Sequence, residues 1–225
     1  MPIANLKAII FDMDGTLFNS FSVSYDAIRE GYELFWKEIG VDGPTPSWQE
    51  VKRLIGLPTH EFYPAALPEE HRDKWGILSR YVGRAERRRL AEGEGRTFDG
   101  VHEALAELQE RGFVLGCLSN ASRRYFDAVM DECNLRKYFR KLRHIGEFYN
   151  IQKSDVLREW SAEFGGSGHL LYVGDRRGDI EAAHDAGVRA VGVTWGYGVP
   201  EELAGAEAVI DSMTELPDLV GLPAQ

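Results

Sequence analysis

The sequence contains few cysteines, and this limits the kinds of protein that it can form. Its 225 residues include only Cys117, inside an apolar run, and Cys133, on a helix-like stretch. Two cysteines in such different surroundings predict neither a disulfide framework nor a zinc site. We expect both to be buried thiols.

Long apolar runs are also missing. The first seven residues, 1–7, have neither the basic start nor the apolar stretch of a signal peptide. No later segment is apolar over the roughly 20 residues that a membrane-spanning helix needs. We therefore expect a cytoplasmic protein with no membrane partner.

Positive charge is in deficit. The chain has 36 acidic and 26 basic residues, which gives a formal net charge of −10. A phosphate-rich polymer would meet a repulsive average field, so we do not expect a nucleic-acid partner. A local pocket for one small phosphate ester remains compatible with this charge. The sequence carries no signal for the oligomeric state.

The residues that are abundant indicate a globular α/β fold. Hydrophobic residues make up 44% of the chain, enough for one sizeable core with or without a small accessory domain. Short apolar runs alternate with segments of helical periodicity, which predicts a doubly wound parallel sheet with helices on both faces. The expected strands are residues 8–11, 113–118, 142–145, 169–173 and 188–193. Helices are expected over 101–111 and after Lys153, where Ser154 is a plausible N-cap.

Residues 18–92 break this alternation, because they contain helix signals and no convincing strand. Apolar residues recur at helical steps between Tyr25 and Ile39, and Ser47 and Glu50 have the spacing of a capping box. A third helix is expected over about 69–90, followed by a glycine-containing linker, 92–95. We therefore predict an all-helical cap, 18–92, inserted into an α/β core made of 1–17 and 93–225.

The strongest chemical signal follows the first expected strand. Asp12 and Asp14 lie two residues apart in the run F-D-M-D-G-T-L, so an extended backbone directs both carboxylates to the same side. Side chains at the carboxyl ends of parallel strands face the ligand crevice of such sheets. Gly15 permits a sharp turn, and Thr16 adds a hydroxyl. Alone, this motif would also suit an acidic turn that caps a helix.

Three later segments supply what the two aspartates lack. Ser119 and Asn120 end the second expected strand and offer a hydroxyl and an amide for phosphoryl oxygens. Lys153 stands at a helix start and offers a positive charge. Asp175 and Asp179 follow the fourth expected strand and, with Asp12, resemble the oxygen ligands of a hard cation. Taken singly, these residues would suit helix caps and exposed turns.

Together the four segments resemble the motifs of the haloacid dehalogenase-like hydrolase superfamily in its phosphatase branch. The ordered set D-x-D-G-T, strand-end serine, later lysine and G-D-x-x-x-D covers almost the whole chain. The inserted helices resemble the cap of phosphoglycolate phosphatases and β-phosphoglucomutases on a Rossmann-like core. Residues 55–58 are similar to a cap loop of the phosphoglycolate phosphatase group, and 193–198 to a loop after its fifth strand. The family's lysine is commonly followed by proline, whereas Ser154 follows Lys153 here.

The resemblance implies a Mg²⁺-dependent phosphatase for a small phosphate monoester. Asp12 would be the nucleophile that forms an aspartyl-phosphate, and Asp14 the general acid and base. Ser119 and Lys153 would complete the catalytic set, with Thr16 and Asn120 in substrate binding. Mg²⁺ would be held by Asp12, the Asp14 carbonyl and Asp175, with Asp179 in its outer shell or holding Lys153.

Other activities stay open to different degrees. Dehalogenases and phosphonate hydrolases of the superfamily lack an acid at the position of Asp14, which argues against both. A phosphomutase keeps all four motifs and is the main alternative. A non-enzymatic phospho-accepting signalling module, the alternative from another class, would lack an inserted cap. In the cap, Arg53, Gly56 and His60 are candidates for contacting the leaving group, and the expected substrates are 2-phosphoglycolate, sugar phosphates and nucleoside monophosphates, in that order.

Overall fold

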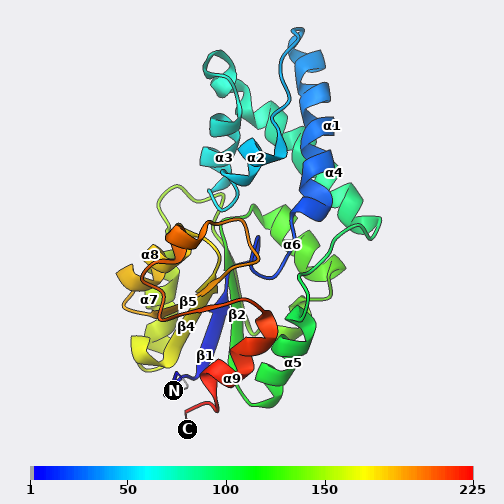
Figure 1. Ribbon diagram of the computed structural model, residues 1–225. Helices are drawn as coiled ribbons and strands as arrows, with labels where there is room; N and C mark the ends of the chain where they lie inside the picture. The colour runs from blue at the N-terminus through cyan, green and yellow to red at the C-terminus, as the bar shows by residue number, and fades with distance from the viewer. Residues whose placement is uncertain (1–2, 225) are drawn as a thin grey trace.

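The computed structural model describes residues 3–224 and contains one six-stranded parallel sheet (Figure 1). The first two residues of the N-terminal segment considered above lie outside the described part. The strand order is β3-β2-β1-β4-β5-β6, so β1 is central, and every pairing is parallel. The strands are β1 (Ala8–Phe11), β2 (Val114–Ser119), β3 (Lys141–His144), β4 (Leu170–Gly174), β5 (Arg189–Val193) and β6 (Ala208–Ile210).

Helices cover both faces of the sheet, as predicted. They are α5 (Val101–Glu110), α6 (Arg123–Glu132), α7 (Lys153–Glu163), α8 (Arg177–Asp185) and α9 (Leu216–Val220), with short 3₁₀ helices at Arg136–Tyr138, Ser167–His169, Pro200–Leu203 and Met213–Glu215. Alternation along β1 sets the two layers: Ile9 and Phe11 pack with α5, α6 and α9, whereas Ala8 and Ile10 pack with α7 and α8. Both cysteines are free and buried, which confirms the prediction for them.

The register brings the ends of three strands to the same level. Phe11 of β1 pairs with Cys117 of β2 and with Val173 of β4. Asp12 therefore stands level with Leu118 and Gly174, so that Ser119 and Asp175 come one residue further along their own strands. Residues remote in sequence are thus gathered at one edge of the sheet.

Beyond this edge lie the helices α1 (Phe21–Ile39), α2 (Trp48–Lys52), α3 (Thr59–Ala66) and α4 (Trp75–Ala91), which form the upper part of Figure 1. They share a hydrophobic cluster of their own, which includes Tyr32, Phe35 and Leu78. The predicted capping box is present at α2, where Ser47 accepts from the Glu50 N–H and the Glu50 carboxylate accepts from the Ser47 N–H. We call α1 to α4 with their connections the helical cap.

The two connections between the cap and the sheet run side by side. The Asn19 N–H donates to the Arg96 carbonyl at 2.9 Å, and Phe18 bridges to Thr97. Phe18 and Leu90 belong to the hydrophobic core of the sheet, so the cap shares side chains with it at both connections. The cap limits 18 and 92, and motion at these connections, stay predictions. No helix within residues 3–224 combines the length and the apolar character needed to cross a membrane.

Three local predictions differ from the structure. The helix expected over 69–90 is a 3₁₀ helix, Glu69–Lys74, followed by α4. The N-cap of α7 is Gln152 instead of Ser154, because the Asp155 carboxylate accepts from the Gln152 N–H at 2.9 Å and Ser154 is buried in the first turn. Strand β6 was not predicted, since three residues at a sheet edge carry too short a pattern to recognise.

Candidate active site

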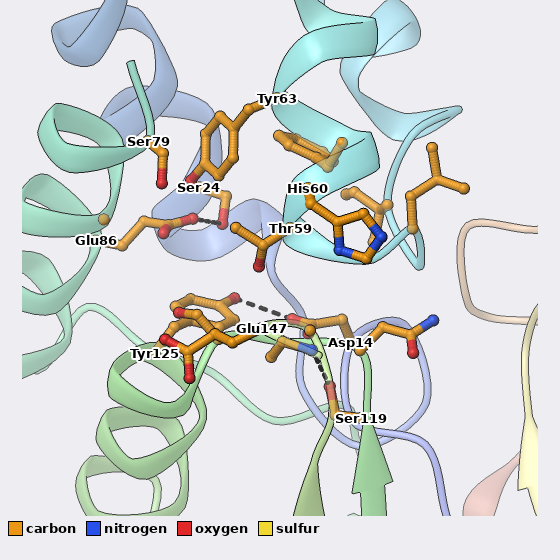
Figure 2. A pocket seen from close by; sticks show the side chains of 18 of the residues that line it. Asp14, Ser24, Thr59, His60, Tyr63, Ser79, Glu86, Ser119, Tyr125 and Glu147 are labelled. Atoms are coloured by element: carbon orange, nitrogen blue, oxygen red, sulfur yellow. Dashed lines mark hydrogen bonds between the residues drawn. The ribbon is translucent and has the colours of Figure 1, made fainter. Parts of the chain in front are cut away.

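A cavity of ≈ 560 Å³ lies between the cap and the carboxyl edge of the sheet. Figure 2 shows its side chains, with Asp14, Ser119 and Tyr125 below and the cap residues His60 and Tyr63 above. Asp12 also lines the cavity. The volume is typical of sites for small organic ligands.

Lys153 is not among the lining residues of this cavity, and its ammonium group binds two carboxylates. Its ammonium group donates to Asp12 Oδ1 and to Asp179 Oδ1, both at 2.7 Å, and all three side chains are buried. The Tyr172 hydroxyl also donates to Asp179 Oδ1, at 3.2 Å. Burial lowers the pKa of Lys153, but the charges of Asp12 and Asp179 outweigh it and raise the pKa above its usual value. Lys153 therefore stays charged.

Asp175 is completely buried and is enclosed by backbone. Its Oδ2 accepts from the Tyr197 N–H at 2.7 Å, and Oδ1 accepts from the Thr16 hydroxyl at 3.3 Å. Gly15, with φ 90°, allows this approach, because a Cβ there would collide with the Asp175 carboxylate. Burial and the charge of Asp179 raise the pKa of Asp175 to about 7.

Asp12, Asp175 and Asp179 form a cluster that fits a hard divalent cation. One ligand atom from each lies within 4.8 Å of the others, and all three residues are buried. Lys153 is the only ammonium group that contacts Asp12 and Asp179 among residues 3–224, so two negative charges lack a partner. Burial raises the pKa of Asp12 well above its usual value, the charge of Lys153 opposes this rise, and the charges of Asp179 and Asp175 add to it. A carboxylate cluster with excess negative charge is the donor set that Mg²⁺ and Ca²⁺ prefer.

Asp14 reaches into the cavity and is held by two hydroxyls. Ser20 donates to its Oδ1, and the Tyr125 hydroxyl donates to the same oxygen at 2.9 Å (Figure 2). Burial raises the pKa of Asp14, although both hydrogen bonds work in the opposite direction. The other carboxylate oxygen is left for a ligand. A raised pKa is what proton transfer near neutral pH requires.

The end of β2 places polar groups beside the aspartates. Ser119 is buried, and its hydroxyl accepts from the Ala121 N–H at 3.0 Å. The Asn120 amide donates to the Gly56 carbonyl at 2.6 Å and so ties the core to the loop between α2 and α3. Both residues line the cavity. In this arrangement Asn120 also contacts the cap, which the sequence did not indicate.

Of the three cap residues expected to contact the leaving group, two line the cavity and one does not. Gly56 and His60 line the cavity, and His60 Nδ1 is buried without a hydrogen-bond partner among the described residues. Arg53 is exposed and lines a second cavity, which Lys153 and Asp179 also line and which shares Gly56 with the first. Thr16 is buried against Asp175 and does not line the cavity. Substrate contacts by these four residues stay predictions.

Sequence reasoning missed several residues of the site. Ser20 and Tyr125 hold Asp14, while Ser24 donates to the buried carboxylate of Glu86 at 2.8 Å. Arg176 donates to the cap carbonyls of Ile55 and Lys52, at 2.8 and 3.2 Å. A helical period links Ser20 to Ser24 in the sequence, but no pattern joins α1 to Tyr125 or Glu86. These contacts arise from tertiary packing.

Comparison with known proteins agrees with this geometry. The model of the family described as haloacid dehalogenase-like hydrolase matches residues 9–193. A phosphoglycolate phosphatase of Vibrio parahaemolyticus is 26% identical over 236 residues, which cover 100% of both chains. An N-acetylmuramic acid 6-phosphate phosphatase of Pseudomonas aeruginosa is 26% identical, with 98% of this chain and 97% of that protein covered.

Solved structures show the same fold. The crystal structure of a predicted phosphoglycolate phosphatase from Haemophilus somnus 129pt superposes with a TM-score of 0.82 at 23% identity, over 97% of this chain and 99% of that one. CbbY from Rhodobacter sphaeroides, in complex with phosphate, gives 0.73 at 23% identity, over 94% and 96%. The family match spans most of the chain and includes all four motif segments. This chain belongs to the haloacid dehalogenase-like hydrolase family, as its motifs predicted.

Proposed function

We propose that this protein is a Mg²⁺-dependent phosphatase that hydrolyses a small phosphate monoester through an aspartyl-phosphate on Asp12. The observation that carries the proposal is the different setting of two neighbouring carboxylates, Asp12 and Asp14, at the carboxyl edge of the sheet. Asp12 is fixed by Lys153 at one oxygen, and Asp14 stands next to it with a raised pKa. One carboxylate is thus poised for attack and the other for proton transfer.

In the first step, an Asp12 carboxylate oxygen forms a bond to phosphorus as the bond from phosphorus to the ester oxygen breaks. Lys153 holds Oδ1, so Oδ2 is the oxygen left for this attack. Asp14, in its protonated form, gives its proton to the departing oxygen, which leaves as an alcohol. Tyr125 and Ser20 keep Asp14 in place during the transfer.

In the second step, Asp14 is the general base. It removes a proton from water, and the water oxygen bonds to phosphorus while the bond to Asp12 breaks. Inorganic phosphate leaves and the Asp12 carboxylate is restored. The Ser119 hydroxyl and neighbouring N–H groups would orient the phosphoryl oxygens.

Asp12, Asp175 and the Asp14 carbonyl would hold Mg²⁺, with Asp179 in the outer shell. The cation neutralises the repulsion between the Asp12 carboxylate and the phosphate dianion. Asp179 also fixes the ammonium group of Lys153, so it has a role whether or not it contacts the metal. The uncompensated charge of the buried carboxylates supports this assignment.

The similar proteins support a small ester as the substrate. Relatives of full length are named phosphatases for phosphoglycolate and for N-acetylmuramic acid 6-phosphate. The cavity of ≈ 560 Å³ accommodates alcohols of either size. We place the leaving group between Tyr125 and the cap, where the cavity extends beyond Asp14 (Figure 2).

The test is phosphate release from a panel of monoesters with Mg²⁺ by the purified protein and its Asp12→Asn variant. We expect turnover by the first and none by the second, because an amide is a poor nucleophile of similar shape. The exposed Asp99→Asn is the matched control and should keep full activity. Activity of Asp12→Asn within tenfold of the unaltered protein would refute the nucleophile. Transfer of the phosphoryl group to a second hydroxyl of a sugar, without phosphate release, would indicate a phosphomutase.

A further inference from the structure

One buried carboxylate in the cavity has no part in the reaction described above. Glu86 of α4 is 9% exposed and faces the cavity from the cap side, opposite Tyr125 (Figure 2). Its Oε1 accepts from the Ser24 hydroxyl at 2.8 Å, and no described residue donates to Oε2. A buried acid with one free oxygen is costly unless it has a further partner.

The position of Glu86 relative to the reacting atoms follows from α1. Ser20 donates to Asp14, and Ser24 donates to Glu86. The Ser24 N–H bonds to the Ser20 carbonyl at 2.8 Å, so the two serines are one helical turn apart. Glu86 and Asp14 line the same cavity, and the charge of Asp14 acts on Glu86, so Glu86 lies near Asp14 on the side of the cap.

The wall around Glu86 is polar, and Arg80, Arg87 and Arg124 line the same cavity. The hydroxyl-bearing residues Ser24, Thr59, Tyr63 and Ser79 line this part of the cavity. Burial raises the pKa of Glu86 to about 7, and the charge of Asp14 adds to the rise while Arg87 opposes it. Arg80, another residue of the lining, is bound to Glu38 by two hydrogen bonds of 2.8 and 2.6 Å. Burial and the charge of Asp14 already disfavour the ionised form of Glu86, so the negative charge of a substrate carboxylate beside it would be disfavoured too.

We propose that Glu86 is a specificity residue that excludes a carboxylate close to the ester oxygen and selects a neutral, hydroxylated leaving group. The inference rests on the proposed phosphatase function. In 2-phosphoglycolate the carboxylate carbon is only two bonds from the ester oxygen, so a bound carboxylate would lie in the part of the cavity that Asp14 and Glu86 share. A polyol or sugar phosphate presents a hydroxyl at this point, and the hydroxyl donates to Glu86 Oε2. The substrate class is therefore the phosphate monoester of a neutral polyol or sugar.

Matched pairs of esters test the proposal directly. Glycerol 3-phosphate and 3-phosphoglycerate share a three-carbon skeleton and differ in one terminal group, as do 2-hydroxyethyl phosphate and 2-phosphoglycolate. At pH 8, where Glu86 is ionised, we expect kcat/KM to favour the alcohol of each pair about tenfold or more. Glu86→Gln keeps the shape and should reduce this preference at least about fivefold, chiefly by raising the activity on the acids.

Two reference variants, Glu33→Gln and the inactive Asp12→Asn, separate the possible results. Glu33→Gln removes an exposed carboxylate of the same cap and should leave the ratio unchanged. Hydrolysis of acid and alcohol at equal rates, or a ratio that Glu86→Gln does not alter, would overturn the inference while the phosphatase function stood. If no ester, p-nitrophenyl phosphate included, released phosphate above the level of Asp12→Asn, the proposed function and this inference would fall together. The ratios of the unaltered protein decide the matter even if Glu86→Gln does not fold.

Discussion

Arg176 links the core to the cap by three hydrogen bonds, so its removal should weaken closure over the site. Its side chain is 20% exposed, and its guanidinium group donates to the carbonyls of Ile55, Lys52 and Arg53 at 2.8, 3.2 and 3.4 Å. These carbonyls belong to the end of α2 and the loop that follows it. The link to Glu202, at 2.9 Å, lies within the core and does not affect closure.

The hydrogen bonds of Arg176 set the free energy by which it stabilises the closed cap. A hydrogen bond from a charged donor contributes about 1.5–3 kcal/mol. The bond to Ile55, at 2.8 Å, is the shortest of the three, and water partly replaces these bonds in the open state. We therefore assign about 2 kcal/mol to the link, which corresponds to about a 30-fold shift toward the open cap. Closure excludes water and completes the site, so kcat/KM for a polyol phosphate should fall by up to this factor.

The assay compares Arg176→Met with Arg177→Met. Arg177 is an exposed neighbour whose side chain makes no hydrogen bond to the cap among residues 3–224. Arg177→Met should leave kcat/KM unchanged. With p-nitrophenyl phosphate, a small activated ester, Arg176→Met should lose much less than with the polyol ester, and its Mg²⁺ requirement should stay the same. Equal losses on both esters would show that Arg176 acts on the neighbouring aspartate instead of the cap, and no loss would refute the link.

Four further outcomes are expected. Asp175→Asn should raise the Mg²⁺ concentration needed for half-maximal activity, and full turnover in excess chelator would contradict the metal assignment. His60→Ala should change the ranking among esters more than it changes hydrolysis of p-nitrophenyl phosphate, because His60 lines the cavity; equal losses on every ester would refute this role. Gly15→Ala should lower the free energy of unfolding by about 2 kcal/mol or more, measured by denaturant titration, since it adds strain at φ 90° and a clash. Glu86 has a pKa of about 7 when folded and 4.5 as its ordinary value, so it binds its proton more tightly in the folded state. Stability should therefore fall by about 3 kcal/mol as pH rises from 4.5 through 7, and Glu86→Gln should remove that slope.

Closely spaced residues made the core of the site predictable from the sequence. Asp12 and Asp14 directly follow a four-residue apolar run, and Asp175 follows another, so strand ends and acids could be recognised together. Parallel strands share a carboxyl edge, which is enough to predict that these segments meet. The signal was local, with a general rule of sheet topology joining the pieces.

Predictions failed or stayed open where a local sequence pattern fitted more than one residue equally well. Gln152 precedes α7 and Ser154 lies in its first turn, so either residue is a candidate N-cap by sequence. The Asp155 carboxylate accepts from the Gln152 N–H, which makes Gln152 the N-cap. Arg53 and His60 belong to one loop, yet its turn at Gly56 separates them into different cavities. Sequence spacing does not report the direction of a side chain in an irregular loop.

The sequence by itself determined β1 to β5, the inserted helices and the aspartates, because each is encoded by neighbours within a few residues or by strand order. Only the tertiary structure decided what surrounds them. Tyr125 reaches Asp14 across 111 positions, and Ser24 reaches Glu86 across 62. Arg176 reaches Ile55 across 121. Such contacts depend on how α1, α4 and α6 pack together, and packing geometry is a property of all the buried side chains at once, which no local pattern contains.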